Sequence, residues 1–123
     1  MKKFEINKNL KLERITPLNK HHFFGYYDKS TWDSSGRYFL GLETDFIDHL
    51  PSKTDKAKII LIDLKKNETK IIGETNAWNW QQGCMLQWLP PKYKKKIIYN
   101  TSLNGKFVSI IQNVFSGEKK ILP

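Results

Sequence analysis

Residues 30–40, with the sequence STWDSSGRYFL, indicate a β-hairpin. Asp33 is a residue type that hydrogen-bonds its own backbone, and Gly36 permits a positive φ, so we predict a turn between them. Polar and apolar residues alternate over residues 37–43, which is typical of a half-buried strand. We therefore expect Trp32 to end one short strand and residues 37–43 to form the next.

The order of elements in this region occurs a second time, at a spacing of about 50 residues. Residues 60–64 (ILIDL) align with residues 110–114 (IIQNV), and residues 67–72 (NETKII) align with residues 117–122 (GEKKIL). Each copy contains four short candidate strands, which is typical of the blades of a β-propeller. The sequence therefore predicts an all-β fold of two four-stranded antiparallel blades.

The repeat also sets the expected domain boundaries. Residues 21–75 form the first predicted blade, and residues 76–123 form the second. Residues 1–20 alternate weakly, which favours an incoming strand that would close a ring of blades. Known rings use at least about four blades, so we expect a fragment of a larger β-propeller. The alternative is an autonomous small β-sandwich.

The formal net charge of +9 raises the question of a nucleic-acid partner. The positive charge comes almost entirely from scattered lysines, which also protect exposed strand edges. Arginine, the better partner for phosphate and bases, occurs only at Arg14 and Arg37. We therefore do not expect a nucleic-acid partner.

The chain has few features of an exported or membrane protein. No stretch approaches the about 18 consecutive apolar residues of a membrane-spanning helix, and no signal peptide is apparent. Its single cysteine, Cys84, cannot form an internal disulfide. These observations predict a cytoplasmic protein that makes no membrane contact.

Two segments of unusual composition precede the repeated hairpins. The first leading segment, residues 21–30, reads HHFFGYYDKS, and the second, residues 77–88, reads AWNWQQGCMLQW. Counted back from Trp32 and Trp88, they occupy equivalent positions. In a propeller such segments run along one end of the central channel, so we expect them to lie side by side.

The composition of the leading segments suits carbohydrate, because aromatic rings stack on sugar faces and amides bind hydroxyl groups. We expect Trp78, Trp80 and Tyr26 to stack. The sugar hydroxyl groups would form hydrogen bonds with Asn79, Gln82 and Asp28. The full set of candidate ligand-binding residues is His21, His22, Tyr26, Tyr27, Asp28, Trp78, Asn79, Trp80, Gln81 and Gln82.

Tryptophan at a blade junction also serves to pack neighbouring blades together. For Trp32 and Trp88 we favour this packing role, since each ends a predicted strand. For Trp78 and Trp80 both interpretations stay open, because the interleaved amide side chains would be costly to bury without partners.

At residues 30–40 the chain resembles a repeat of bacterial propellers that reads Trp, Ser, Pro, Asp, Gly and then an apolar strand. Trp32, Gly36 and the strand match, whereas Ser35 replaces the aspartate. With the leading segments included, the chain resembles an uncharacterised bacterial family of seven-bladed β-propellers. More distantly it is similar to the propeller of oligogalacturonate lyase, which holds a divalent metal and cleaves pectin fragments by β-elimination. The resemblance implies a fold and no established activity.

Three functions are consistent with the sequence. We favour a non-catalytic fragment whose full-length form binds a carbohydrate or glycoconjugate at the channel mouth. The first alternative is a metal-assisted polysaccharide lyase or hydrolase that uses His21 or His22 as ligand or general base. The second is a protein-interaction scaffold. No metal site or cofactor is assigned, and the expected partners are a glycan and the remaining propeller blades.

Overall fold

The computed structural model describes residues 8–123, which form an all-β structure of eight strands without a helix. The strands make two antiparallel four-stranded sheets, and in each sheet the strands follow their order in the chain. This confirms the predicted fold class. Sheet 1 contains β1 (His21–Phe23), β2 (Tyr38–Thr44), β3 (Ala57–Asp63) and β4 (Glu68–Thr75). Sheet 2 contains β5 (Gln87–Trp88), β6 (Lys96–Leu103), β7 (Lys106–Asn113) and β8 (Lys119–Leu122).

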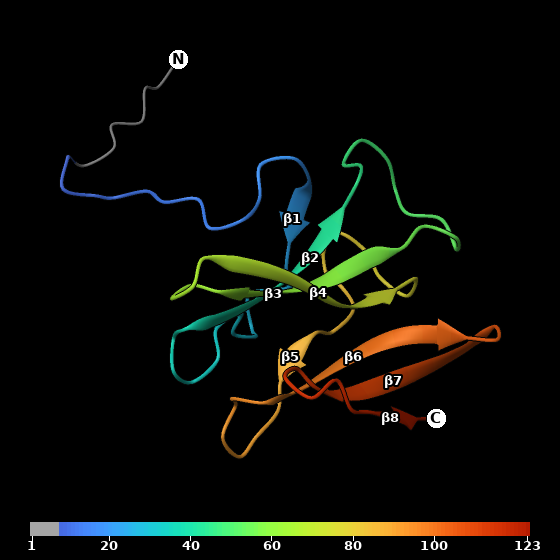
Figure 1. Cartoon of the computed structure of the whole chain (residues 1–123). Helices are drawn as coiled ribbons and strands as arrows, with labels where there is room; N and C mark the ends of the chain where they lie inside the picture. The colour runs from blue at the N-terminus through green and yellow to red at the C-terminus, as the bar shows by residue number, and fades with distance from the viewer. Residues whose placement is uncertain (1–7) are drawn as a thin grey trace.

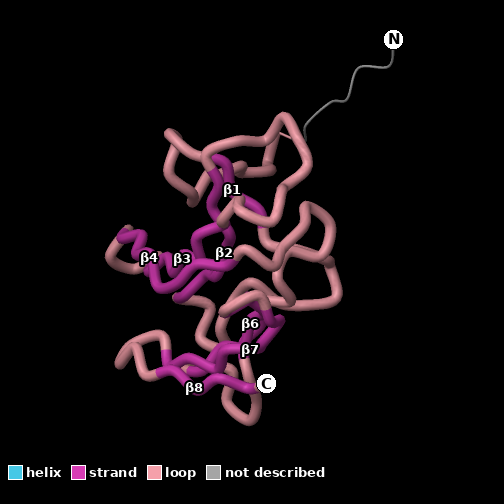
Figure 2. Tube along the Cα trace, turned by 90° about the vertical axis from the view of Figure 1, so that its right-hand side faces the viewer, coloured by secondary structure: helices cyan, strands magenta, loops and turns pink. Residues whose placement is uncertain are grey.

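The two sheets form separate layers in both views of the chain (Figures 1 and 2). Residues 8–20 lead into β1 through turns and irregular chain. The part of the predicted ring-closing strand in residues 1–7 lies outside the described residues.

The hairpin turns form where their local sequence requires them. Asn104 and Gly105, with φ of 52° and 75°, join β6 to β7, as expected for a two-residue turn that needs positive φ at both positions. Gly36 has a φ of 74°, and its N–H donates to the carbonyl of Asp33 over 3.2 Å. The predicted turn before β2 is therefore present.

The first strand of sheet 1 differs from the expectation. β1 pairs with the end of β2, and Trp32 returns to the sheet only through an isolated bridge to Phe39. Residues 24–31 loop out between these two contacts. One local cause is Ser30, whose hydroxyl oxygen accepts a hydrogen bond from the N–H of Trp32 over 3.1 Å. Ser30 therefore forms a side-chain turn at the point where the chain rejoins the sheet.

One apolar core joins the sheets. Successive side chains of a strand point to opposite faces, so each sheet has an inner face toward the other sheet and an outer face. The inner face of sheet 1 carries Leu40, Leu42 and Ile59, and that of sheet 2 carries Ile97 and Tyr99. The buried core consists of Leu40, Leu42, Ala57, Ile59, Leu61, Trp78, Cys84, Leu86, Trp88, Ile97, Tyr99, Ile110 and Val114.

A short polar chain crosses this core. The Tyr99 hydroxyl donates to Oε1 of Gln112 over 3.0 Å, and Nε2 of Gln112 donates to the carbonyl of Ile72 over 2.7 Å. A Cβ at Gly73 would lie 2.9 Å from the Tyr99 hydroxyl oxygen, so only glycine lets the phenol approach the sheet this closely. Burial raises the pKa of Tyr99 to about 12.

This phenol predicts a loss of stability in alkaline solution. Between its ordinary pKa of 10.0 and its pKa of about 12 in the fold, the unfolded chain loses the phenol proton and the folded chain retains it. The free energy of unfolding should therefore fall as the pH rises from about 10 toward 12. Urea denaturation at pH 8 and pH 11 measures the fall, and Tyr99→Phe should remove this residue's share of it. An equal fall in both proteins would contradict the assignment.

Candidate functional site

The two leading segments contact each other at one rim of the sheet pair. The ring of Phe23 lies 5.5 Å from that of Trp78 and 5.0 Å from that of Trp80, centroid to centroid. The backbones of the two segments are also in close contact, because a Cβ added at Gly83 would lie 2.4 Å from the carbonyl oxygen of Phe24. A Cβ at Gly25 would lie 2.8 Å from that of Gln82. The structure thus brings together the two segments that sequence equivalence predicted to be neighbours.

The indoles of Trp78 and Trp80, in the second leading segment, donate hydrogen bonds to the long loop between β2 and β3. Nε1 of Trp78 donates to the carbonyl of Asp55 over 3.0 Å, and Nε1 of Trp80 donates to the carbonyl of His49 over 2.9 Å. The His49 ring stacks on Phe46 at 4.0 Å, and Phe46 contacts both indoles. Trp78 is only 8% exposed. Both indoles therefore have a packing role, whatever else they contact.

A tight turn presents the amides of the same segment. Oδ1 of Asn79 accepts hydrogen bonds from the N–H groups of Gln81 and Gln82, over 3.1 and 2.7 Å. Two backbone hydrogen bonds between Asn79 and Gly83 close the turn. Asn79 therefore shapes the turn with its side-chain oxygen, as this residue type does in many loops.

The two histidines of the first leading segment separate, as alternation along a strand requires. His22 lies opposite Glu43 in the β1–β2 register, and its Nε2 is 2.9 Å from Oε2 of Glu43. Both side chains are at least nine-tenths buried, and Nδ1 of His22 has no hydrogen-bond partner among the described residues. His21 is exposed.

Of the remaining candidates of the first segment, Tyr27 and Asp28 are exposed and Tyr26 is half-buried. The rings of Tyr26 and Tyr27 contact each other at 4.5 Å, and Tyr27 is 87% exposed. Oδ1 of Asp28 accepts a hydrogen bond from Nζ of Lys29 over 2.8 Å.

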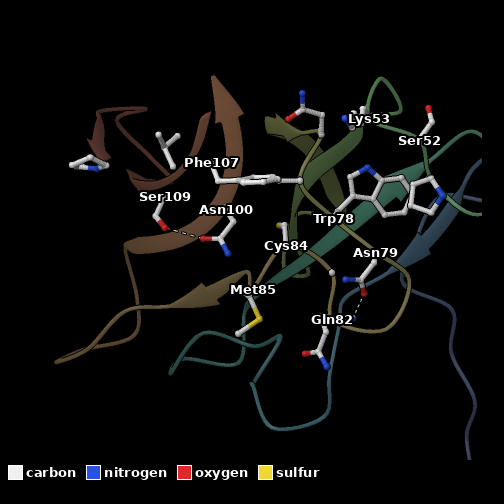
Figure 3. A pocket seen from close by; sticks show the side chains of 16 residues that line it. Ser52, Lys53, Trp78, Asn79, Gln82, Cys84, Met85, Asn100, Phe107 and Ser109 are labelled. Atoms are coloured by element: carbon white, nitrogen blue, oxygen red, sulfur yellow. Dashed lines mark hydrogen bonds between the residues drawn. The ribbon is translucent and has the colours of Figure 1, made fainter. Parts of the chain in front are cut away.

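A cavity of about 520 Å³ lies between the second leading segment and the outer face of sheet 2 (Figure 3). Of the ten predicted residues, Trp78, Asn79 and Gln82 line it, and the other seven do not. Further lining comes from Ser52 and Lys53 of the long loop, Cys84 and Met85, Asn100 of β6, and Phe107 and Ser109 of β7. The Phe107 ring is 81% exposed.

Sequence reasoning missed the part of this cavity that sheet 2 supplies. Asn100 and Ser109 lie opposite each other, and the Ser109 hydroxyl donates to Oδ1 of Asn100 over 2.8 Å. The equivalent residues of the first copy, Leu42 and Ile59, are apolar and lie opposite each other in the core. The sequence does contain a signal for this side of the cavity. At equivalent positions of the two repeats, the second copy has the polar pair Asn100 and Ser109 where the first copy has an apolar pair.

The cavity contains a thiol of low reactivity. Cys84 is 1% exposed, and burial raises its pKa to about 12, so the neutral thiol persists at physiological pH. A neutral thiol is a poor nucleophile and a poor metal ligand. Within residues 8–123, no three His, Cys, Asp or Glu side chains gather in a metal-binding arrangement.

Comparisons with known proteins do not assign the chain to a family. A scan against protein-family models and searches of curated proteins and of solved structures returned no match. The resemblance to seven-bladed propellers and the membership of a larger ring therefore remain predictions from sequence. Across residues 8–123, no helix has the length and apolar character needed to cross a membrane.

Proposed function

We propose that this chain binds carbohydrate, free or in a glycoconjugate, in the cavity between the second leading segment and sheet 2. One observation carries the proposal: the exposed ring of Phe107 stands beside several amide side chains around a cavity of about 520 Å³. Ligand sites of proteins commonly have volumes of about 300–1,000 Å³ and a few polar groups placed among apolar ones.

The roles in this proposal follow from the chemistry of each side chain. Phe107 stacks on the C–H face of a pyranose ring, a role that we had expected of Trp80 and Tyr26. The amides of Gln82 and Asn100 both donate and accept, so each can satisfy a sugar hydroxyl group. Lys53 adds a cationic donor from the long loop.

We propose that this part of the chain binds carbohydrate and does not itself catalyse a reaction. We also propose that the chain is part of a larger propeller, which is supported by the two similar sheets and by the repeat in sequence. We further propose that the protein is located in a reducing cytoplasm, which is supported by a buried cysteine that forms no disulfide.

A glycan array followed by calorimetry tests the proposed site. Phe107→Ala should weaken binding of the best glycan by about tenfold or more, because it removes the stacking ring. Phe115→Ala is a matched control, because Phe115 is 49% exposed and does not line the cavity. Binding that is absent from the wild-type chain, or equal in the wild type and Phe107→Ala, would contradict the proposal.

A further inference from the structure

The densest run of lysines in the chain lies in the loop between β5 and β6. Four of the residues 92–96 are lysine, and each of the four is exposed. Among residues 8–123 none of the four forms an ion pair, although lysines elsewhere, such as Lys20 and Lys56, pair with carboxylates. The loop therefore carries positive charges that the described part of the chain does not pair.

The same loop encloses a groove. Residues 89–96 line a groove of about 520 Å³, and none of the other described residues contributes to its lining. Its apolar surface comes from Leu89, Pro90, Pro91 and the ring of Tyr93, which is 48% exposed. The four lysines line the groove as well, so apolar surface and positive charge occur side by side.

Hydrogen bonds hold the loop in this shape. The N–H of Leu89 donates to the carbonyl of Lys96 over 2.8 Å, and the N–H of Tyr93 donates to the carbonyl of Leu89 over 3.1 Å. Ser34, in the turn before β2, donates its N–H to the carbonyl of Tyr93 over 2.9 Å and its hydroxyl to the carbonyl of Lys92 over 2.8 Å. A partner would therefore meet a groove that is already formed, which lowers the entropy cost of binding.

The groove lies away from the carbohydrate cavity and from the sheet faces on which further blades would pack. It shares no lining residue with that cavity. In Figure 1 the loop between β5 and β6, drawn in orange at the lower left, and the turn between β6 and β7 lie at opposite ends of sheet 2. Propeller blades pack through the faces of their sheets, so a loop at the end of the strands stays open in a complete ring.

We propose that this loop binds an acidic segment of a partner protein, which places an apolar side chain in the groove. The positive charges of Lys94 and Lys95 attract the carboxylates of the segment, and the ring of Tyr93 contacts its apolar side chain. Charge complementarity identifies this occupant, because unpaired ammonium groups select carboxylates and the apolar lining selects an apolar side chain between them.

Two other anionic partners fit these features less well. Nucleic acid is bound best by arginine, whose planar fork matches a phosphate group, and residues 89–96 contain no arginine. An anionic membrane is contacted by apolar side chains that protrude into it, whereas this loop presents a groove that receives one. Both partners are therefore included in the experiment as competing outcomes.

Fluorescence anisotropy with two labelled synthetic peptides tests the proposal. One peptide carries a Leu-Phe pair between runs of Asp and Glu, and the other carries Ser-Ser in place of that pair. The wild-type chain should bind the Leu-Phe peptide more tightly. Lys94→Glu combined with Lys95→Glu should weaken this binding by about tenfold or more, because attractive pairs become repulsive.

A matched pair of substitutions separates the loop from the overall charge. Lys65→Glu combined with Lys66→Glu makes the same change of charge in the exposed turn between β3 and β4, and neither residue lines the groove. This control should weaken binding by less than about twofold, since salt screens charges that do not contact the peptide.

Tyr93→Asn tests the groove itself. Tyr93 has a φ of 51°, and asparagine tolerates a positive φ, so the loop should keep its shape while it loses the ring. This variant should lose most of the wild type's preference for the Leu-Phe peptide over the Ser-Ser peptide. Circular dichroism confirms that each variant is folded.

Four results would overturn the proposal. They are a wild-type chain that binds neither peptide, equal weakening by the two pairs of lysine substitutions, an unchanged preference in Tyr93→Asn, and tighter binding of oligo(dT) or phosphatidylserine vesicles than of the Leu-Phe peptide. None of these measurements involves glycan, so failure here is distinct from failure of the carbohydrate proposal.

Discussion

Replacing Gly83 by alanine should lower the free energy of unfolding by about 2–5 kcal/mol. Gly83 has a φ of 62°, and an added Cβ would lie 2.4 Å from the carbonyl oxygen of Phe24 and 3.1 Å from Cδ1 of Leu42. The first of these atoms belongs to backbone and cannot rotate away. The two leading segments would therefore have to separate. Urea denaturation monitored by tryptophan fluorescence measures the loss.

Gly117→Ala separates this clash from backbone strain. Gly117 has a φ of 79°, and an added Cβ there would meet nothing within 4 Å. Alanine at this position should cost only about 1–2 kcal/mol, the ordinary penalty of the left-handed conformation. Equal losses in the two variants would show that the leading segments do not depend on close backbone contact.

Trp88→Ala should be as damaging, with an expected loss of about 3–5 kcal/mol, because it leaves a large cavity between the sheets. Trp88 is 4% exposed and also satisfies the carbonyl of Thr31. Trp32→Ala, at the equivalent position of the first copy, should cost about 1 kcal/mol, since Trp32 is 41% exposed.

Similar losses at the two positions would contradict the observed packing of the two sheets, because that packing buries Trp88 and leaves Trp32 41% exposed. Trp88 and Trp32 had the same predicted role from sequence, and their different burial comes entirely from which face of each sheet is covered.

Local sequence was sufficient to predict much of the fold. The turn between Asp33 and Gly36 and the strand that follows it depend on near neighbours, and both lie within one residue of their predicted positions. The path of residues 24–31 was not predicted, because it depends on the side chain of Ser30 and on contact with the second leading segment.

The candidate site was predicted only in part, for a similar reason. Equivalent positions in the repeat were sufficient to predict that the leading segments are neighbours. The hydrogen-bond partners of Trp78 and Trp80 lie in a long loop whose path depends on tertiary packing. Phe107 looked like an ordinary strand residue, since the loop residues that share its cavity lie about 50 positions earlier in the chain.

The indole N–H signals of the four tryptophans provide a direct readout of where a glycan binds. Titrating the ¹⁵N-labelled chain with the best glycan from the array should shift the signal of Trp78, which lines the cavity, and leave that of Trp32 unchanged. A glycan that shifts only Trp32, or that saturates the chain without moving Trp78, would contradict a carbohydrate site between the second leading segment and sheet 2.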